Sequence, residues 1–259
     1  MESLEQFLEF SQKLTGSLEQ RSEVIGLIFL GSAAEITRLD KWSDHDFFVI
    51  TKSGFGEALR QDLSWLPDLD RVVLSPRETQ HGLKVVYENG HVLEFAVFED
   101  QELQTVPIND FAVALDRTDL AERMSRIQAN AAPKPINENA EFELFLATLL
   151  IGIGRERRGE KLTAGQFVHS FSMNYVLGLV RAWVAPQPGT TAKEDTLNRY
   201  RRFEIQYPEI AESLEALHHL ANEEAGRTLL NLVENIGGDR LDETKHEQIA
   251  FLRRTLDWV

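Results

Sequence analysis

The sequence contains no cysteine and is short of positive charge. The absence of cysteine excludes disulfide bonds, thiolate metal ligands and a cysteine nucleophile. The 27 lysines and arginines stand against 42 aspartates and glutamates, which gives a formal net charge of −15. Proteins that bind nucleic acid phosphates or anionic membrane surfaces need clustered cations. The charge therefore disfavours both partners and leaves small molecules, cationic partners, or anions bound through metal ions.

Long hydrophobic runs are missing as well. The longest apolar stretch, around Leu144 to Ile153, is far below the ~20 residues that a membrane-spanning helix needs. The first residues, Met1 to Glu5, have neither the basic nor the apolar region of a signal peptide. We therefore expect a cytoplasmic protein without a membrane partner. The 259 residues suffice for one large domain or two of ordinary size.

Apolar spacing over the first hundred residues predicts a mixed α/β sheet. Helices are expected at 3–15, 33–39 and 57–66, and strands at 24–30, 46–51, 71–74, 83–87 and 91–98. The last two strands flank Asn89-Gly90, a strong signal for a hairpin turn. Helices and strands that alternate in this way are typical of a sheet covered by helices.

The remainder of the chain has helical spacing almost throughout. Helices are expected at 110–127, 138–158, 163–184, 194–205, 208–221, 223–235 and 242–258. Two prolines, Pro133 and Pro135, indicate a linker. The predicted fold class is α+β, with a mixed sheet and its helices in residues 1–133 and an all-helical domain in residues 137–259.

Two short motifs near the first strands have the chemistry of a phosphate and metal site. The first strand ends at Gly31-Ser32, where backbone N–H groups and a hydroxyl are aimed at one spot that suits phosphate oxygens. Gly31 allows a close approach of the backbone. Asp44 and Asp46 are two residues apart at the start of a strand, so both carboxylates lie on one face. Two such oxygen ligands suit a Mg²⁺ ion that also binds the phosphates of a substrate.

A third carboxylate is expected from a later strand. Glu94 is the only acid within the apolar run from His91 to Phe98, and a lone carboxylate in a sheet core is costly unless it is paired or metal-bound. Its expected task is to serve as third metal ligand or as general base for an attacking hydroxyl. Glu99 and Asp100 lie just beyond and remain alternatives for this acid.

The order of these motifs resembles the nucleotidyltransferase superfamily that includes DNA polymerase β. The motifs are Gly-Ser, a spacer, Ser-Asp-x-Asp before an apolar strand, and an acid on a later strand. The resemblance covers residues 24–98. A helical domain after the α/β domain is similar to the antibiotic nucleotidyltransferases, which adenylylate aminoglycosides or lincosamides. The resemblance implies that Gly31, Ser32 and Ser43 hold the nucleotide phosphates and that Asp44 and Asp46 hold Mg²⁺.

The resemblance extends to Leu93-Glu94, which looks like the strand that supplies the catalytic base in streptomycin/spectinomycin adenylyltransferases. His45 departs from the pattern, because the position between the two aspartates is usually apolar. Strand alternation places His45 on the face opposite the metal, so no ligand role is expected and its packing stays open.

Arginines stand out against the acidic background of the helical part. Arg199 and Arg202 lie three positions apart, on one face of the helix expected there, and Arg202 is assigned to the nucleotide. Cations are needed on a triphosphate to stabilise charge on departing pyrophosphate. The arginines at 155, 157 and 158 are read as a solvated helix end, since cations favour a helix C-terminus.

The predicted function is Mg²⁺-dependent transfer of a nucleoside monophosphate from ATP to a hydroxyl of a small molecule, an aminoglycoside or lincosamide antibiotic. Such an enzyme would confer antibiotic resistance, and its acidic character would attract a polycationic acceptor. One alternative is a nucleotidyltransferase that modifies a protein or a tRNA, as in toxin–antitoxin systems; the net charge weakens the RNA version. A catalytically inactive nucleotide-binding module is the other alternative. Monomer and homodimer both remain open.

Overall fold

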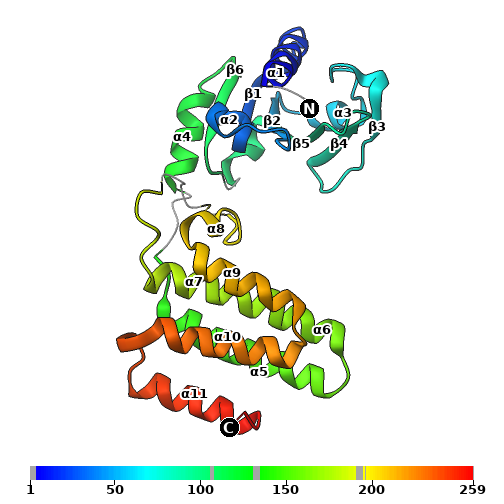
Figure 1. Cartoon of the computed structure of the whole chain (residues 1–259). Coiled ribbons are helices and arrows are strands. Elements are labelled where there is room, and N and C mark those ends of the chain that lie inside the picture. Colours follow the sequence, from blue (N-terminus) through cyan, green and yellow to red (C-terminus); the bar gives the residue numbers. More distant parts are fainter. Residues whose placement is uncertain (1–3, 106–107, 131–134, 191–194, 196, 259) are drawn as a thin grey trace. The chain divides into compact units, whose positions relative to one another are not determined.

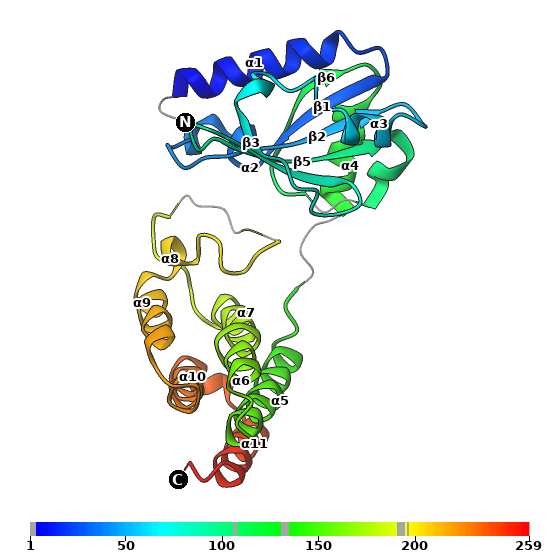
Figure 2. The same cartoon turned by 90° about the vertical axis from the view of Figure 1, so that its right-hand side faces the viewer.

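The computed structural model describes residues 4–105, 108–130, 135–190, 195 and 197–258 (Figures 1 and 2). The chain divides into two compact units, Met1–Ala132 and Pro133–Val259, which we call unit 1 and unit 2. Unit 1 holds a mixed sheet with helices and unit 2 is helical, which confirms the predicted fold class. None of the helices in the described part of the chain has the length and apolar character that a membrane span requires.

The sheet of unit 1 has six strands in the order β3-β4-β5-β2-β1-β6. The strands are β1 Val24–Leu30, β2 His45–Thr51, β3 Val72–Leu74, β4 Gly82–Tyr87, β5 Val92–Glu99 and β6 Phe111–Asp116. All neighbouring pairs are antiparallel except β2 and β5, which run parallel. The five predicted strands are confirmed, and Gly90 occupies the β4–β5 turn with a φ of +79°.

Helices cover both faces of this sheet (Figure 2). The α-helices of unit 1 are α1 Leu4–Glu19, α2 Gly31–Ala34, α3 Gly56–Gln61 and α4 Leu120–Asn130, and the 3₁₀ turns are η1 Ile36–Arg38, η2 Leu69–Arg71 and η3 Asp100–Thr105. Phe47 and Val49 of β2 belong to the core that contains Leu14 of α1. Ile50 belongs to a second core, with Leu120 of α4. Since side chains alternate along a strand, the residues at 46, 48 and 50 face the α4 side.

The helix predicted at 110–127 is wrong in its first half, because residues 111–116 form β6. Phe111 to Leu115 is apolar without a clear period, and its strand form is fixed by backbone pairing with β1, which makes β6 an edge strand of the sheet. The following helix, α4, begins after Asp116, whose carboxylate accepts hydrogen bonds from the backbone N–H groups of Thr118, Leu120 and Ala121. These hydrogen bonds to the Asp116 side chain end the strand β6 and allow the helix α4 to begin.

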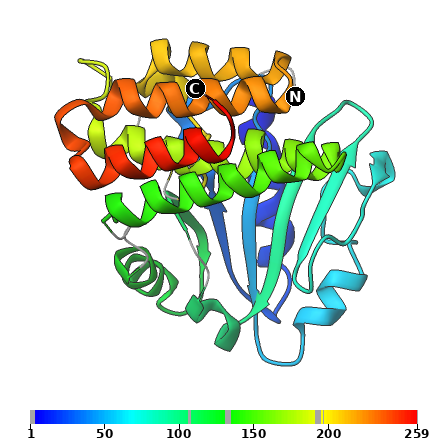
Figure 3. The ribbon, with the colours of Figure 1, turned by 90° about the horizontal axis from the view of Figure 1, so that it is seen from below.

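Unit 2 is built around one apolar core. Its helices are α5 Glu138–Arg157, α6 Lys161–Gln166, the π-helix η4 Phe167–Ser172, α7 Met173–Trp183, α8 Phe203–Gln206, α9 Pro208–Ala216, η5 Leu217–His219, α10 Asn222–Gly237, η6 Gly238–Arg240 and α11 Glu243–Thr255. Figures 1 and 3 show α5, α10 and α11 side by side. The core joins Phe145 and Leu149 of α5, Val180 of α7 and Leu229 of α10. Helical spacing predicted most of these elements.

The helix predicted at 194–205 is wrong for the described residues before Phe203. Residues 199–202 form a turn, and Arg202 has a left-handed backbone with a φ of +61°. The Arg199 guanidinium makes two hydrogen bonds to the Glu141 carboxylate, of 2.7 and 2.8 Å, and a third to the carbonyl of Asn174. These contacts with α5 and α7 outweigh the local helical preference, and helix is present in the described part of this segment only at the four residues of α8.

Candidate active site

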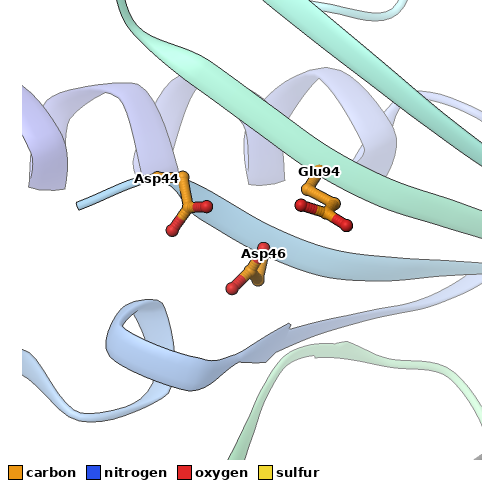
Figure 4. A group of neighbouring side chains, drawn as sticks. All are labelled: Asp44, Asp46 and Glu94. Carbon is orange, nitrogen blue, oxygen red and sulfur yellow. The ribbon is translucent and has the colours of Figure 1, made fainter. Parts of the chain in front are cut away.

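The carboxylates of Asp44, Asp46 and Glu94 point toward a common space beside the sheet (Figure 4). One oxygen from each lies within 4.8 Å of the others. Asp44 directly precedes β2 and Asp46 is its second residue, while Glu94 lies on β5 opposite Asp46 in the parallel register. We call these three residues the carboxylate cluster. Neighbouring strands thus bring together acids that are fifty residues apart in sequence.

The cluster fits a divalent cation with a preference for oxygen. Two oxygens bound to one Mg²⁺ at about 2.1 Å lie roughly 3 to 4 Å apart, so small side-chain rotations bring these carboxylates onto one ion. Asp44 and Asp46 are half-buried, which strengthens their mutual repulsion and their attraction for a cation.

Glu94 differs from the sequence-based expectation in one respect. Its side chain is 49% exposed, so the sheet core imposes no large desolvation cost that a metal would have to offset. Lys84 on the next strand, β4, lies opposite Glu94, with its Nζ 3.6 Å from Glu94 Oε1 and 2.8 Å from Glu78 Oε1. The carboxylates of Glu78 and Glu94 raise the pKa of Lys84. Lys84 therefore stays charged and places a positive charge beside Glu94.

The two alternative acids lie at the other end of β5. Glu99 pairs with Thr51 in the register, and its carboxylate accepts a hydrogen bond from the Gly56 backbone N–H at 3.3 Å. Asp100 forms an ion pair with Arg123. Glu94 is the acid that shares a space with the two aspartates.

Gly31 lies against the cluster. Its φ is +55°, a left-handed conformation that favours glycine, and a Cβ at this position would lie 3.0 Å from Asp46 Oδ2. Glycine thus lets the end of β1 approach the Asp46 carboxylate. Ser32 follows in the four-residue helix α2 and is half-buried.

Ser43 closes the loop that leads into the cluster. Its hydroxyl accepts a hydrogen bond from the Asp40 backbone N–H at 3.0 Å and lies 3.4 Å from the Asp40 carboxylate. The structure therefore shows Ser43 shaping the loop before Asp44, and its assignment to a phosphate stays a prediction.

Arg202 belongs to unit 2, where its Nη2 lies 3.2 Å from the carboxylate of Asp195. Asp195 is almost fully buried, and its Oδ1 accepts backbone hydrogen bonds from Leu197 and Asn198. Arg202 therefore ties down this segment, while its nucleotide-binding role stays a prediction. Arg199 does the same through Glu141.

His45 packs on the face of β2 opposite the two aspartates. Its ring stacks on Phe7 of α1 at 3.6 Å between centroids and is fully buried. His45 Nε2 lies 2.8 Å from Ser11 Oγ, and its Nδ1 lies 2.8 Å from Nε2 of His91. Burial lowers the pKa of His45 to about 2 and that of His91 to about 4, so both rings are neutral at pH 7.

The hydrogen bonds around His45 are consistent with a single direction. Ser11 Oγ donates to the carbonyl of Phe7 at 3.0 Å, so its oxygen accepts from His45 Nε2–H. A neutral His45 then accepts at Nδ1 from His91 Nε2–H. This series of hydrogen bonds connects α1 to β2 at the position between Asp44 and Asp46. It also explains how a histidine is accommodated there.

Trp42 is a candidate that sequence reasoning missed. Its side chain is 82% exposed, and Lys41 Nζ lies 5.1 Å from the centre of its ring. The Asp40 carboxylate fixes the loop by accepting the Trp42 backbone N–H at 2.7 Å. An exposed indole ring offers a flat apolar face on which a ligand ring can stack. The sequence feature that could have indicated this residue is a tryptophan in a polar loop, two residues before Asp44.

Comparison with known proteins gives similarity in structure alone. No protein-family model and no curated protein matches the sequence. The chain is similar to an aminoglycoside 6-adenyltransferase from Bacillus subtilis, with 12% identity, coverage of 93% of this chain and 89% of that one, and a TM-score of 0.34. It is also similar to a nucleotidyltransferase-like protein from Exiguobacterium sibiricum, with 13% identity, coverage of 95% and 79%, and a TM-score of 0.37.

A third similar structure is the CD-NTase CdnG of Bradyrhizobium diazoefficiens in complex with GTP, with 13% identity, coverage of 99% and 91%, and a TM-score of 0.31. All of these similarities have low identity and low TM-scores. The function proposed below therefore depends on the carboxylate cluster and its surroundings.

Proposed function

We propose that the protein is a nucleotidyltransferase that moves a nucleoside monophosphate from a nucleoside triphosphate, ATP by preference, to a hydroxyl group of a small molecule. The observation that carries this proposal is the meeting of Asp44, Asp46 and Glu94, each contributing an oxygen within 4.8 Å of the others. The sequence motifs around them resemble those of the nucleotidyltransferase superfamily. A site made of carboxylates needs a cation to approach phosphates, and its chemistry fits Mg²⁺.

In the proposed reaction the acceptor oxygen forms a bond to the α-phosphorus, and the bond from that phosphorus to pyrophosphate breaks. The hydroxyl proton passes to the Glu94 carboxylate, which is exposed enough to meet an incoming substrate. Mg²⁺ held by Asp44 and Asp46, with Glu94 as a third ligand or as the base, would neutralise charge on the phosphates. Lys84 lies 3.6 Å from the Glu94 carboxylate and would help to orient it before the transfer. Gly31 and Ser32 offer backbone and hydroxyl donors to phosphate oxygens.

The acceptor is proposed to be a cationic antibiotic of the aminoglycoside class, with lincosamides as the second class to test. The net charge of −15 attracts a polycation and repels RNA. A half-buried acidic site favours the same sign of acceptor.

The proposal is tested by incubating the protein with ATP, Mg²⁺ and a panel of aminoglycosides and lincosamides, and by following pyrophosphate release. We expect release with at least one acceptor, its loss with EDTA, and its loss in Asp44→Asn. Asp70→Asn is the matched control, because Asp70 is an exposed aspartate outside the cluster and the substitution changes the net charge equally. Turnover that persists in Asp44→Asn would contradict the proposal.

A second measurement separates the enzyme from an inactive nucleotide-binding module. Calorimetric titration of ATP, with and without Mg²⁺, reports binding independently of any acceptor. Binding that requires Mg²⁺ and Asp44, without release of pyrophosphate for any small molecule, would redirect the search to a protein acceptor. A steep salt dependence of RNA binding would instead indicate a tRNA acceptor.

A further inference from the structure

Unit 2 contains a pocket whose lining residues have no assigned role in the proposed reaction. It has a volume of about 270 Å³ and lies among α7, α8, α9 and η5. Every residue that lines it belongs to unit 2, so its geometry is independent of unit 1. Its apolar floor is buried and consists of Met173, Leu177, Phe203, Ala211 and Leu214.

The rim of the pocket is polar and exposed. It is formed by Tyr200, Glu204, Glu215 and His218. Ala211, Leu214, Glu215 and His218 are spaced by three, one and three residues, so they share one face that runs along α9 into η5. The same face therefore changes from apolar at the floor to acidic at the mouth.

Neither rim glutamate is neutralised by a neighbouring cation in the described part of unit 2. The arginines closest in sequence have other partners: Arg199 pairs with Glu141, and Arg201 and Arg202 pair with Asp195. Among the described residues Glu204 and Glu215 form no ion pair, so the mouth carries two carboxylates, while the Arg181 guanidinium lies against the floor residue Phe203, 5.3 Å from the centre of its ring. A cation at the mouth of the pocket would gain from both carboxylates.

The wall beside the floor is irregular. The π-helix η4 spans Phe167–Ser172 and ends where Met173 begins α7. The Tyr200 hydroxyl donates to the carbonyl of Ser170 in this segment at 2.7 Å, which holds the rim residue against the π-helix. π-helical turns inside α-helices are frequent at functional sites, because they re-aim side chains at a cost in helix stability.

We propose that this pocket binds a small monocationic amine with an apolar, ring-sized body. The body occupies the floor, and the ammonium group lies at the mouth between Glu204 and Glu215. A sugar would find no hydrogen-bonding groups on that floor, and a nucleotide would place its phosphates against two carboxylates. The site therefore differs from the carboxylate cluster, because its ligand has one positive charge and an apolar body, whereas the cluster is proposed to take a metal ion, phosphates and a polycationic acceptor.

The first test compares three probes of one shape: phenethylamine, 2-phenylethanol and 3-phenylpropionate. Calorimetry without nucleotide or metal, supported by amide chemical shifts, gives both affinity and location. We expect phenethylamine to bind about tenfold more tightly than the alcohol, the carboxylate not to bind, and shifts to cluster on α7 and α9. High salt should weaken the amine and leave the alcohol unchanged.

The second test removes the charges. Glu204→Gln and Glu215→Gln should each weaken phenethylamine binding about three- to fivefold, since each pair is partly exposed to solvent. Glu212→Gln is the matched control, because Glu212 is exposed on α9 outside the pocket. Ala211→Leu should fill the floor and abolish binding of both amine and alcohol, while the melting temperature reports whether the variant is folded.

Several results would overturn the proposal. These are equal affinity for amine and alcohol, equal effects of Glu212→Gln and the rim substitutions, shifts confined to unit 1, or no binding at millimolar probe. Asp44→Asn should bind phenethylamine as the unmodified protein does. Failure of nucleotidyl transfer therefore leaves this proposal untouched, and the reverse also holds.

Discussion

Units 1 and 2 use their charged side chains differently. In unit 1 three carboxylates from two neighbouring strands converge, with Lys84 as the cation beside them. In unit 2 the half-buried acids Glu141 and Glu223 each receive hydrogen bonds from an arginine. Like charges that lie together repel one another, and this repulsion is relieved only when a cation binds. Paired opposite charges instead connect neighbouring helices. The comparison therefore separates the carboxylate cluster, which is suited to a cation, from the arginine–glutamate pairs that join the helices of unit 2.

The two units also differ in how their cores form. Unit 1 divides its apolar side chains between the two faces of a sheet, and a pair of neutral histidines lies in one of these layers. The core of unit 2 lies among helices and contains no histidine among its described residues. Each unit should therefore respond to a different perturbation.

The largest difference is expected when one cluster acid loses its charge. Asp46→Asn should reduce nucleotidyl transfer by about 10²–10³-fold, because a metal ligand is lost. It should also keep or raise the melting temperature, since one source of like-charge repulsion disappears. Activity assays and calorimetric melting measure the two effects. A marked loss of stability would show that the cluster is structural.

Removing one acid from a paired site in unit 2 should have the opposite outcome. Glu141→Gln takes the counter-charge from Arg199, whose guanidinium it binds through two hydrogen bonds. We expect a loss of about 2–3 kcal/mol in the unfolding free energy of unit 2. Denaturant unfolding measures the change in free energy, and hydrogen exchange along α5 and α7 shows whether the loss is local to the Arg199 contacts. An unchanged free energy of unfolding in Glu141→Gln would contradict the proposed difference between the two units.

The response to acid should distinguish the units next. Burial among Phe10, Tyr87 and His45 lowers the pKa of His91 from 6.5 to about 4. Between pH 6.5 and 4 the unfolded chain therefore binds a proton at His91 that the folded chain does not. The stability gained from the neutral His91 is complete above pH 6.5 and is lost toward pH 4, by up to about 1.4 kcal/mol per pH unit.

In unit 2 the Arg157 side chain, with Trp258 and Arg227, lowers the pKa of Glu223 from 4.5 to about 2. Its contribution is complete above pH 4.5 and is lost only as the pH falls toward 2. Between pH 6.5 and 4.5, protection factors in β5, corrected for the pH dependence of intrinsic amide exchange, should fall more than those in the part of α10 beyond its first turn, where Asn222 contacts His169, a ring whose pKa is also lowered by burial. His91→Gln should reduce the acid response of β5, and an unchanged response would mean that other groups cause it.

The smallest effect is expected at Trp42. Trp42→Ala should weaken binding of a nucleotide or acceptor about three- to tenfold through lost stacking, with no change in melting temperature. The other tryptophans, at 65, 183 and 258, are at most 8% exposed. Acrylamide quenching therefore reports on Trp42, and protection by ATP and Mg²⁺ would place a ligand on its ring. Equal quenching with and without ligands would contradict a binding role.

The local elements of this fold were predictable where the sequence has one clear period. Five strands and the long helices of unit 2 follow from alternation and helical spacing. β6 was missed because its pairing with β1 is nonlocal, and Arg202 was wrongly placed on a helix because ion pairs with distant residues decide that turn. Local patterns do not contain such contacts.

The sequence alone determined which acids could form a site. Period two places Asp44 and Asp46 on one face of a strand wherever that strand lies. The tertiary structure decided the rest: β2 pairs with β5 in a register that sets Glu94 opposite Asp46, and His45 meets Ser11 and His91 on the reverse face. Strand pairing and burial join residues far apart in the chain, and their energy depends on the whole fold, which no short segment encodes.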